Sequence, residues 1–143
     1  MNKRILCLDI GEKRIGCALS DPTGTISTPH STIHVRNFDQ VTADIKKIIN
    51  EYNVVKIVAG LPIMLNSEKG IQAQKILKFI SDIESKISIP VETYDERFTT
   101  KIAENVMISA DVSREKRKEK IDMLAASITL QAYLDKNNEK KNI

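Results

Sequence analysis

Apolar residues follow two different spacings along this chain, and the spacing changes where strands give way to helices. Three short apolar runs come first, at residues 3–10, 14–20 and 25–35, and short polar turns separate them. Pro29, inside the third run, is typical of an edge strand or a bulge. Three such runs joined by short turns predict an antiparallel meander.

Beyond residue 36 the apolar positions follow helical spacing. Asn37 can cap a helix in which residues 41, 45, 48, 49 and 52 share one apolar face. The later elements are predicted as a strand at 54–60, a loop at 61–68, a helix at 69–86, a strand at 91–95, a helix capped by Thr99 or Thr100, and a final helix that begins near 113–117. Strands that follow helices are expected to lie parallel to earlier ones, through right-handed crossovers.

This order of elements predicts an α/β fold, a mixed sheet of five strands with helices on both faces. The first strand should lie in the middle, beside the strand at 54–60, whose continuous apolar run is typical of a buried parallel strand. The length of 143 residues fits a single domain. We expect that domain to span residues 1–135 and a polar, fraying tail to follow at 136–143.

Composition excludes several classes of protein. With 41% hydrophobic and 29% charged residues, the chain is neither disordered nor collagen-like. No apolar run approaches the roughly 18–20 residues of a membrane span, and the run at 5–10 is too short for a signal peptide. Cys7 and Cys17 form no CxxC pair, so we expect both to fill the core. A cytoplasmic protein without a membrane partner is predicted.

The small net charge of +3 is concentrated in one place. Residues 114–120 read REKRKEK and hold five bases and two acids, a net of +3, so the remaining 17 bases and 17 acids balance. The bases of this run are Arg114, Lys116, Arg117, Lys118 and Lys120. Such a run is either a solvated helix start or a patch that binds nucleic-acid phosphates.

Three carboxylates stand where a core or a ligand site is expected. Asp9 is near the end of the apolar first strand, Glu96 follows the fifth strand, and Asp122 interrupts the last helix. Ligand sites in open α/β sheets form beyond the carboxyl ends of the parallel strands, where Asp9 and Glu96 should converge. Oxygen ligands without His or Cys suit Mg²⁺ or Mn²⁺, and two ions about 4 Å apart can promote cleavage of a phosphodiester.

Each acid also has a purely structural alternative. Glu96 can be an exposed loop residue. The alternative ion pairs are Asp9 with Arg14 or Arg97, and Asp122 with Lys118 or Lys120. We favour a metal site, because all three acids fall at positions that the topology should bring together.

Four sequence blocks carry a family resemblance. They are LDIGEKRIG at 8–16 followed by SD at 20–21, GLP at 60–62 with Gly70 and Ala73, DERFTT at 95–100, and KIDMLAA at 120–126 with Gln131, Tyr133 and Leu134. In this order they resemble the YqgF family, described as Holliday junction resolvases and as nucleases of precursor 16S rRNA. Two small departures are Cys17, where Val is usual, and Phe98, where Leu is usual.

The resemblance implies an RNase H-like fold with strand order 3-2-1-4-5. It also implies that Asp9, Glu96 and Asp122 are the catalytic carboxylates that bind the metal ions. We therefore expect a metal-dependent nuclease that acts on structured RNA, most of all the 5′ end of precursor 16S rRNA, or on branched DNA.

Substrate phosphates have several candidate ligands near these acids. Lys13, Arg14 and Arg97 are neighbours of the acids in sequence, and Thr99 and Thr100 can donate at a helix N-terminus or serve as simple caps. The basic run at 114–120 leads directly to Asp122, which favours substrate binding. Aromatic residues make up only 4% of the chain, so we expect contacts to the backbone rather than base stacking.

Three other functions stay open at this point. A Holliday junction resolvase would use the same acids but would need a symmetric dimer, and the oligomeric state is not readable from the chain. Asp9-Ile10-Gly11 also resembles the phosphate loop of actin-like ATPases, which need a second Asp-x-Gly loop that this chain lacks. A non-catalytic RNA-binding assembly or transcription factor is the remaining alternative.

Overall fold

The computed structural model describes residues 3–62, 67–96 and 114–141, which form five strands and three helices. The strands are β1 (Arg4–Ile10), β2 (Arg14–Ser20), β3 (Ser27–His34), β4 (Val54–Pro62) and β5 (Val91–Glu96), and the helices are α1 (Phe38–Tyr52), α2 (Ser67–Glu84) and α4 (Arg114–Lys141). None of these three helices is both long enough and apolar enough to cross a membrane.

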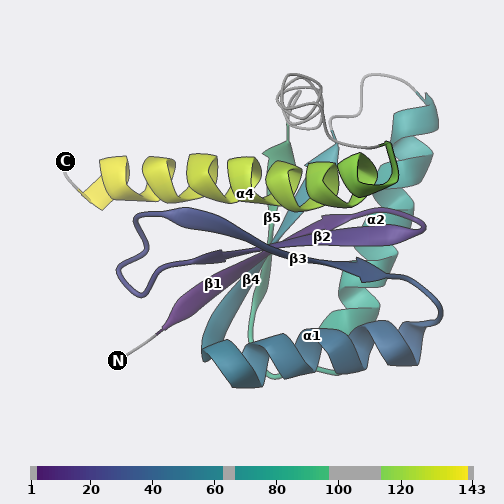
Figure 1. Cartoon of the computed structure of the whole chain (residues 1–143), viewed down its shortest axis with the longest axis horizontal. Helices are drawn as coiled ribbons and strands as arrows, with labels where there is room; N and C mark the ends of the chain where they lie inside the picture. The colour runs from purple at the N-terminus through teal and green to yellow at the C-terminus, as the bar shows by residue number, and fades with distance from the viewer. Residues whose placement is uncertain (1–2, 63–66, 97–113, 142–143) are drawn as a thin grey trace.

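The five strands form one mixed sheet in the order β3-β2-β1-β4-β5 (Figure 1). β1 pairs antiparallel with β2 and parallel with β4, and β4 pairs parallel with β5. This confirms the predicted meander, the central place of the first strand and the strand order. The carboxyl ends of β1, β4 and β5 therefore lie together at the same end of the sheet.

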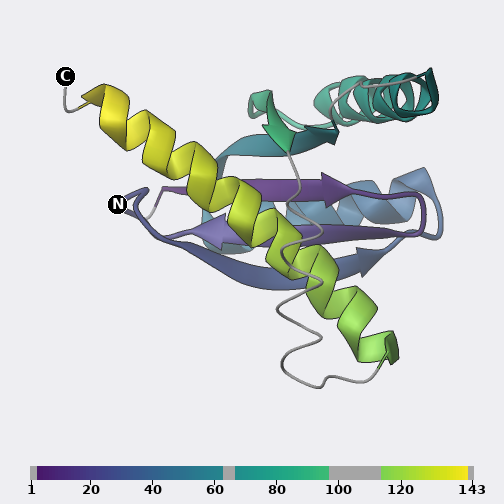
Figure 2. The ribbon, with the colours of Figure 1, turned by 90° about the horizontal axis from the view of Figure 1, so that it is seen from above.

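Helices cover both faces of the sheet, as predicted (Figures 1 and 2). On one face Leu6 and Leu8 pack in a core with residues of α1 and α2. On the other face Cys7 packs in a second core with Ala126 and Leu130 of α4. Because side chains alternate along a strand, Asp9 belongs to the face that α4 covers.

Local signals in the sequence explain where α1 begins and ends. The side chain of Asn37 accepts a hydrogen bond from the backbone N–H of Gln40, and the side-chain oxygen of Gln40 accepts one from the backbone N–H of Asn37, which confirms the predicted cap. Asn53 then adopts a left-handed backbone with φ of 53°, which ends the helix and starts β4.

Both cysteines are buried and neither is in a disulfide, as expected for core residues. Burial raises the pKa of the Cys17 thiol to about 12, so this side chain stays protonated at physiological pH. A buried, protonated thiol such as that of Cys17 is a poor nucleophile and a poor metal ligand.

Some boundaries differ from the sequence prediction. β3 begins only at Ser27, because the carboxylate of Asp21 binds the backbone N–H groups of Thr25 and Ile26 in the preceding turn. β4 continues to Pro62, and α2 begins within the expected loop.

The last helix also differs from expectation. α4 continues to Lys141, through the stretch predicted to fray, and the side chain of Asn138 there donates a hydrogen bond to the carbonyl of Gly24. The helix expected after Thr99 or Thr100 lies outside the described residues.

Candidate active site

Gly16 of β2 is the point at which the backbone of Asp122 approaches the strand position paired with Asp9. Asp9 is the register partner of Gly16 in β2, so both residues present the same face of the sheet. A Cβ atom on Gly16 would lie 1.9 Å from the backbone carbonyl oxygen of Asp122. The backbone of α4 therefore rests directly on β2 at the position next to Asp9. Two of the three predicted acidic residues thus have their backbones at neighbouring positions on this face of the sheet.

Arg14 fixes the carboxylate of Asp122. Its Nε atom donates to Oδ2 of Asp122 at 2.6 Å, and the two side chains are only 30% and 21% exposed. Arg14 lies on the same face of β2 as Gly16, two residues away. A half-buried, charge-assisted hydrogen bond of this length restricts the orientation of the carboxylate. Asp122 therefore pairs with a base from the sheet, not with Lys118 or Lys120 of its own helix.

Further contacts hold α4 in register on the sheet near the site. The hydroxyl of Thr32 donates to the backbone carbonyl of Glu119 at 2.7 Å, and His34 Nε2 lies 2.9 Å from the Glu119 carboxylate. Farther along the helix, the Gln131 side chain accepts from the backbone of Ser27 and donates to the carbonyl of Thr25. These bonds tie both halves of α4 to the β2–β3 hairpin and so define where Asp122 lies.

A polar cluster anchors the distal half of α4 to β4 and β5. The ammonium of Lys56 lies 2.6 Å from both the hydroxyl of Tyr133 and the carboxylate of Glu92, and Tyr133 donates to Glu92 at 2.8 Å. Burial lowers the pKa of Lys56, but the hydrogen bonds to Glu92 and Tyr133 outweigh it and raise the pKa overall. Tyr133 is buried and also packs edge-on against Tyr94. We interpret this cluster as structural support for the helix that carries Asp122.

The third predicted carboxylate is placed only by its backbone. Glu96 is the last residue of β5 and pairs with Pro62 at the carboxyl end of β4. This is the same edge of the sheet at which β1 ends after Asp9. The side chain of Glu96 lies outside what the structure describes, as do Arg97, Thr99 and Thr100.

The basic run forms the first turns of α4, which extend beyond β3, the outermost strand on that side of the sheet (Figure 2). Lys116, Lys118 and Lys120 are exposed, and Arg117 is half-buried. The side chain of Arg114 is not among those described. Lys13 is also exposed, in the turn between β1 and β2. Exposed cations thus lie on the same helix as Asp122, within two turns of it.

The donor set at the site fits a hard divalent cation. Asp9 and Asp122 supply carboxylate oxygens, the ligands that Mg²⁺ and Mn²⁺ prefer. The direct contact of the Asp122 backbone with Gly16 places the backbone of Asp122 next to the position that pairs with Asp9. Within residues 3–62, 67–96 and 114–141, no group of three His, Cys, Asp or Glu side chains gathers as a complete metal site. Glu96, the third acid predicted from the sequence, lies by its backbone at the same end of the sheet.

Gly16 is a position of the candidate site that the sequence analysis did not single out. A lone glycine inside a strand is a known sign of close backbone approach, and Gly16 stands in the middle of an otherwise apolar run. The residues that hold α4 on the sheet, such as Thr32 of β3 and Gln131 of α4, gave no comparable signal in the sequence. They act through contacts between segments that are distant in the chain.

Comparisons with known proteins found similar sequences over nearly the whole chain. A family model described as "RuvX: Holliday junction resolvase" matches residues 3–136. A protein of Desulforamulus reducens is 44% identical over 132 residues, covering 92% of this chain and 96% of its own length. One from Thermoanaerobacter pseudethanolicus is 46% identical over 138 residues, covering 96% and 99%. Both are named "Putative pre-16S rRNA nuclease".

Solved structures support the fold. RuvC of T. thermophilus, in complex with a Holliday junction substrate, matches with a TM-score of 0.56 at 12% identity and covers 92% of this chain and 96% of its own. Fowlpox virus resolvase, in complex with Holliday junction DNA, matches with a TM-score of 0.57 at 15% identity, covering 93% and 97%. These likenesses and the strand order confirm the RNase H-like fold.

Proposed function

Because this chain belongs to the RuvX family, we propose that it is a metal-dependent nuclease in which Asp9, Asp122 and Glu96 form the catalytic site. That the chain is a nuclease, a hydrolase of phosphodiester bonds, follows from its family and its relatives. The observation that carries the assignment of the site is the close contact between the backbone of Asp122 and Gly16, the residue that pairs with Asp9. The nuclease domain, predicted from the sequence to span residues 1–135, would include the rest of α4 as far as Lys141, because Asn138 bonds to the turn at Gly24.

The three acids act as metal ligands in this proposal. Asp9, on the central strand, would hold the divalent ions together with Glu96 and Asp122. Bound Mg²⁺ or Mn²⁺ supplies Lewis acidity that stabilises the charge developing on the phosphoryl oxygens. Arg14 keeps the Asp122 carboxylate oriented through the 2.6 Å hydrogen bond. The helix contacts at Thr32 and Gln131 hold α4, and therefore Asp122, against the sheet.

The substrate we favour is structured RNA, most of all the 5′ end of precursor 16S rRNA. Its support is the name shared by the curated relatives at 44–46% identity. The exposed lysines at the start of α4, together with Arg117 and Arg114, offer cations to the phosphate backbone. Lys13, Arg97, Thr99 and Thr100 are further candidates for phosphate contacts. A role in maturing ribosomal RNA would place the protein in the cytoplasm.

Cleavage of a four-way DNA junction is the second candidate. It is favoured by the description of the family model and by the junction complexes of the two structural neighbours. A junction resolvase cuts two strands and so requires two sites, supplied by a symmetric dimer. The rRNA proposal requires only one.

A direct comparison of substrates tests the proposal. The purified full-length chain with Mg²⁺ or Mn²⁺ is incubated separately with precursor 16S rRNA, mature 16S rRNA, a four-way DNA junction and linear duplex DNA. We expect cleavage of the precursor at its 5′ extension and little cleavage of the other three. Preferential, paired nicking of the junction would support the second candidate, and RNA binding without turnover on any substrate would support a non-catalytic role.

A further inference from the structure

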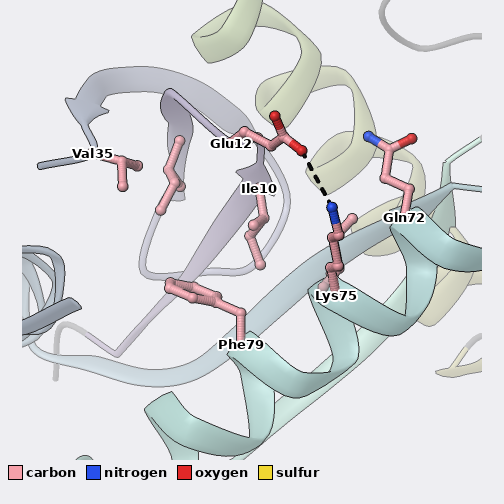
Figure 3. A pocket seen from close by; sticks show the side chains of 9 residues that line it. Ile10, Glu12, Val35, Gln72, Lys75 and Phe79 are labelled. Atoms are coloured by element: carbon pink, nitrogen blue, oxygen red, sulfur yellow. Dashed lines mark ion pairs between the residues drawn. The ribbon is translucent and has the colours of Figure 1, made fainter. Parts of the chain in front are cut away.

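A cavity of about 200 Å³ lies near the carboxyl end of β1, on the face of the sheet opposite α4. It opens between the end of β1, the residue that follows β3 and helix α2 (Figure 3). Its walls are apolar and are formed by Ile10, Ile15, Val35, Ile76 and Phe79. Sites for drug-sized ligands measure roughly 300–1,000 Å³, so this cavity suits a single ring system rather than a large ligand.

Three polar side chains stand at the mouth of the cavity. Glu12 and Lys75 approach each other across it at 3.7 Å, and Gln72 is one turn of α2 before Lys75 (Figure 3). The side chains of Lys75 and Glu12 are 69% and 82% exposed. An exposed ion pair at this distance contributes little stability. The lysine can therefore exchange its partner for a phosphate at little cost, and the amide of Gln72 can both donate and accept.

The cavity is next to the proposed catalytic site. Ile10, one of its walls, directly follows Asp9 in β1, and the two side chains point to opposite faces of the sheet. Only the end of β1 and the turn after it separate the two. A nucleic-acid strand that crosses this edge with a phosphate at Asp9 would bring a neighbouring nucleotide to the cavity.

We propose that this cavity binds one unpaired base of the substrate strand, with the adjoining phosphate on Lys75. This inference rests on the proposed nuclease function. A base has flat apolar faces that the aliphatic walls and Phe79 can contact, and polar edges that Gln72 and Glu12 can bind. An inorganic phosphate would leave the apolar walls unused, and an apolar side chain of a protein partner would leave the polar rim unused. Base and phosphate together use both.

The test is a binding titration with matched variants on the same helix. Short fluorescent single-stranded oligoribonucleotides, in which one abasic position is moved along the chain, are titrated with the full-length protein in EDTA to prevent cleavage. Lys75→Ala and Gln72→Ala remove the rim. Lys78→Ala and Gln74→Ala make the same chemical changes at exposed α2 positions that do not line the cavity.

We expect one abasic position to weaken binding by roughly tenfold, the effect of losing one bound base. The double variant Lys75→Ala/Gln72→Ala should lose this position dependence and bind the intact strand about tenfold more weakly, whereas the double control should resemble the wild type. A flat abasic profile, or equal effects of the two double variants, would overturn the cavity assignment.

The proposal for the cavity and the proposal that the chain is a metal-dependent nuclease can fail independently, and separate measurements decide each. Absence of oligonucleotide binding would also overturn the cavity assignment, whereas Mg²⁺-dependent cleavage of precursor rRNA, measured separately, decides the proposed function. If the cavity instead received a protein side chain, the rim variants would leave oligonucleotide binding unchanged, which again would contradict the proposal.

Discussion

Arg14 Nε and Asp122 Oδ2 lie 2.6 Å apart and join the start of β2 to helix α4 across 108 residues of sequence. Both residues were singled out from the sequence for function, one as a phosphate ligand and the other as a metal ligand. Their direct contact shows that the carboxylate is positioned by the sheet itself. It also keeps a guanidinium cation beside Asp122, near the point where the backbone of α4 contacts Gly16 of β2.

Arg14→Gln removes the cation from Asp122 while keeping much of the side-chain volume. We expect nuclease activity to fall roughly tenfold or more, because a half-buried hydrogen bond to a charged group is worth about 1.5–3 kcal/mol. Cleavage rates at saturating Mg²⁺ measure the effect. Arg36→Gln, the same change at an exposed arginine away from the site, should leave the rate unchanged. Equal rates for the two variants would show that Arg14 has no positioning role.

Gly16→Ala tests the close approach of β2 and α4. The new methyl group would overlap the backbone carbonyl of Asp122, so α4 must move. We expect the free energy of unfolding to fall by about 1–3 kcal/mol and cleavage to fall sharply even where the protein is folded. Denaturant titration and cleavage assays at low temperature measure the two quantities.

Gly24→Ala provides the control for that variant. Gly24 has a left-handed backbone with φ of +70° and open space around it, so alanine costs about 1–2 kcal/mol through backbone strain alone. This variant should lose stability but keep its cleavage rate. If Gly16→Ala behaved in the same way, the packing of α4 on Gly16 would not determine the site.

Replacing Lys116, Lys118 and Lys120 by Gln tests the basic start of α4. If these exposed lysines contact phosphates, the slope of log affinity for RNA against log salt concentration should become shallower by about 2–3. Replacing Lys46, Lys47 and Lys86 removes the same charge from exposed positions elsewhere and should leave the slope nearly unchanged. A slope that responds equally to both sets would exclude a specific patch on α4.

Asp21→Asn tests the turn that precedes β3. Hydrogen bonds from the backbone of Ile26, the side chain of Thr23 and the backbone of Thr25 lower the pKa of Asp21. Its stabilising effect is therefore present above the unfolded pKa of about 3.9 and is lost as pH falls through the lower folded pKa. The variant should be less stable than the wild type at neutral pH, and the difference should shrink toward pH 2. A difference that is constant with pH would contradict this cause.

The sequence predicted most of the fold, because it depends on local periodicity. The apolar run of β1 and the continuous apolar run of β4 were enough to place the central strand, and Asn37 marked the start of α1. The sequence also indicated Asp9 and Asp122, since a carboxylate inside an apolar element needs a compensating partner.

Other features depend on contacts between distant segments and were not predictable. Asp122 pairs with Arg14 rather than with a lysine of its own helix, and only the packing of α4 on β2 brings those side chains together. The last turns of α4 are polar and looked like a tail, yet Asn138 bonds to the turn at Gly24. The cavity beside Ile10 likewise arises from β1, the residue after β3 and α2, which are separated in sequence.

The central claim is that Asp9 is a catalytic metal ligand, and the most direct measurement is the cleavage rate of precursor 16S rRNA by wild type and Asp9→Asn. With Mg²⁺ or Mn²⁺ present, we predict that the substitution lowers the rate by at least on the order of a hundredfold without loss of folding. Asp82→Asn, the same change at an exposed position on α2, should cleave at the wild-type rate. Cleavage by Asp9→Asn at the wild-type rate would contradict the account.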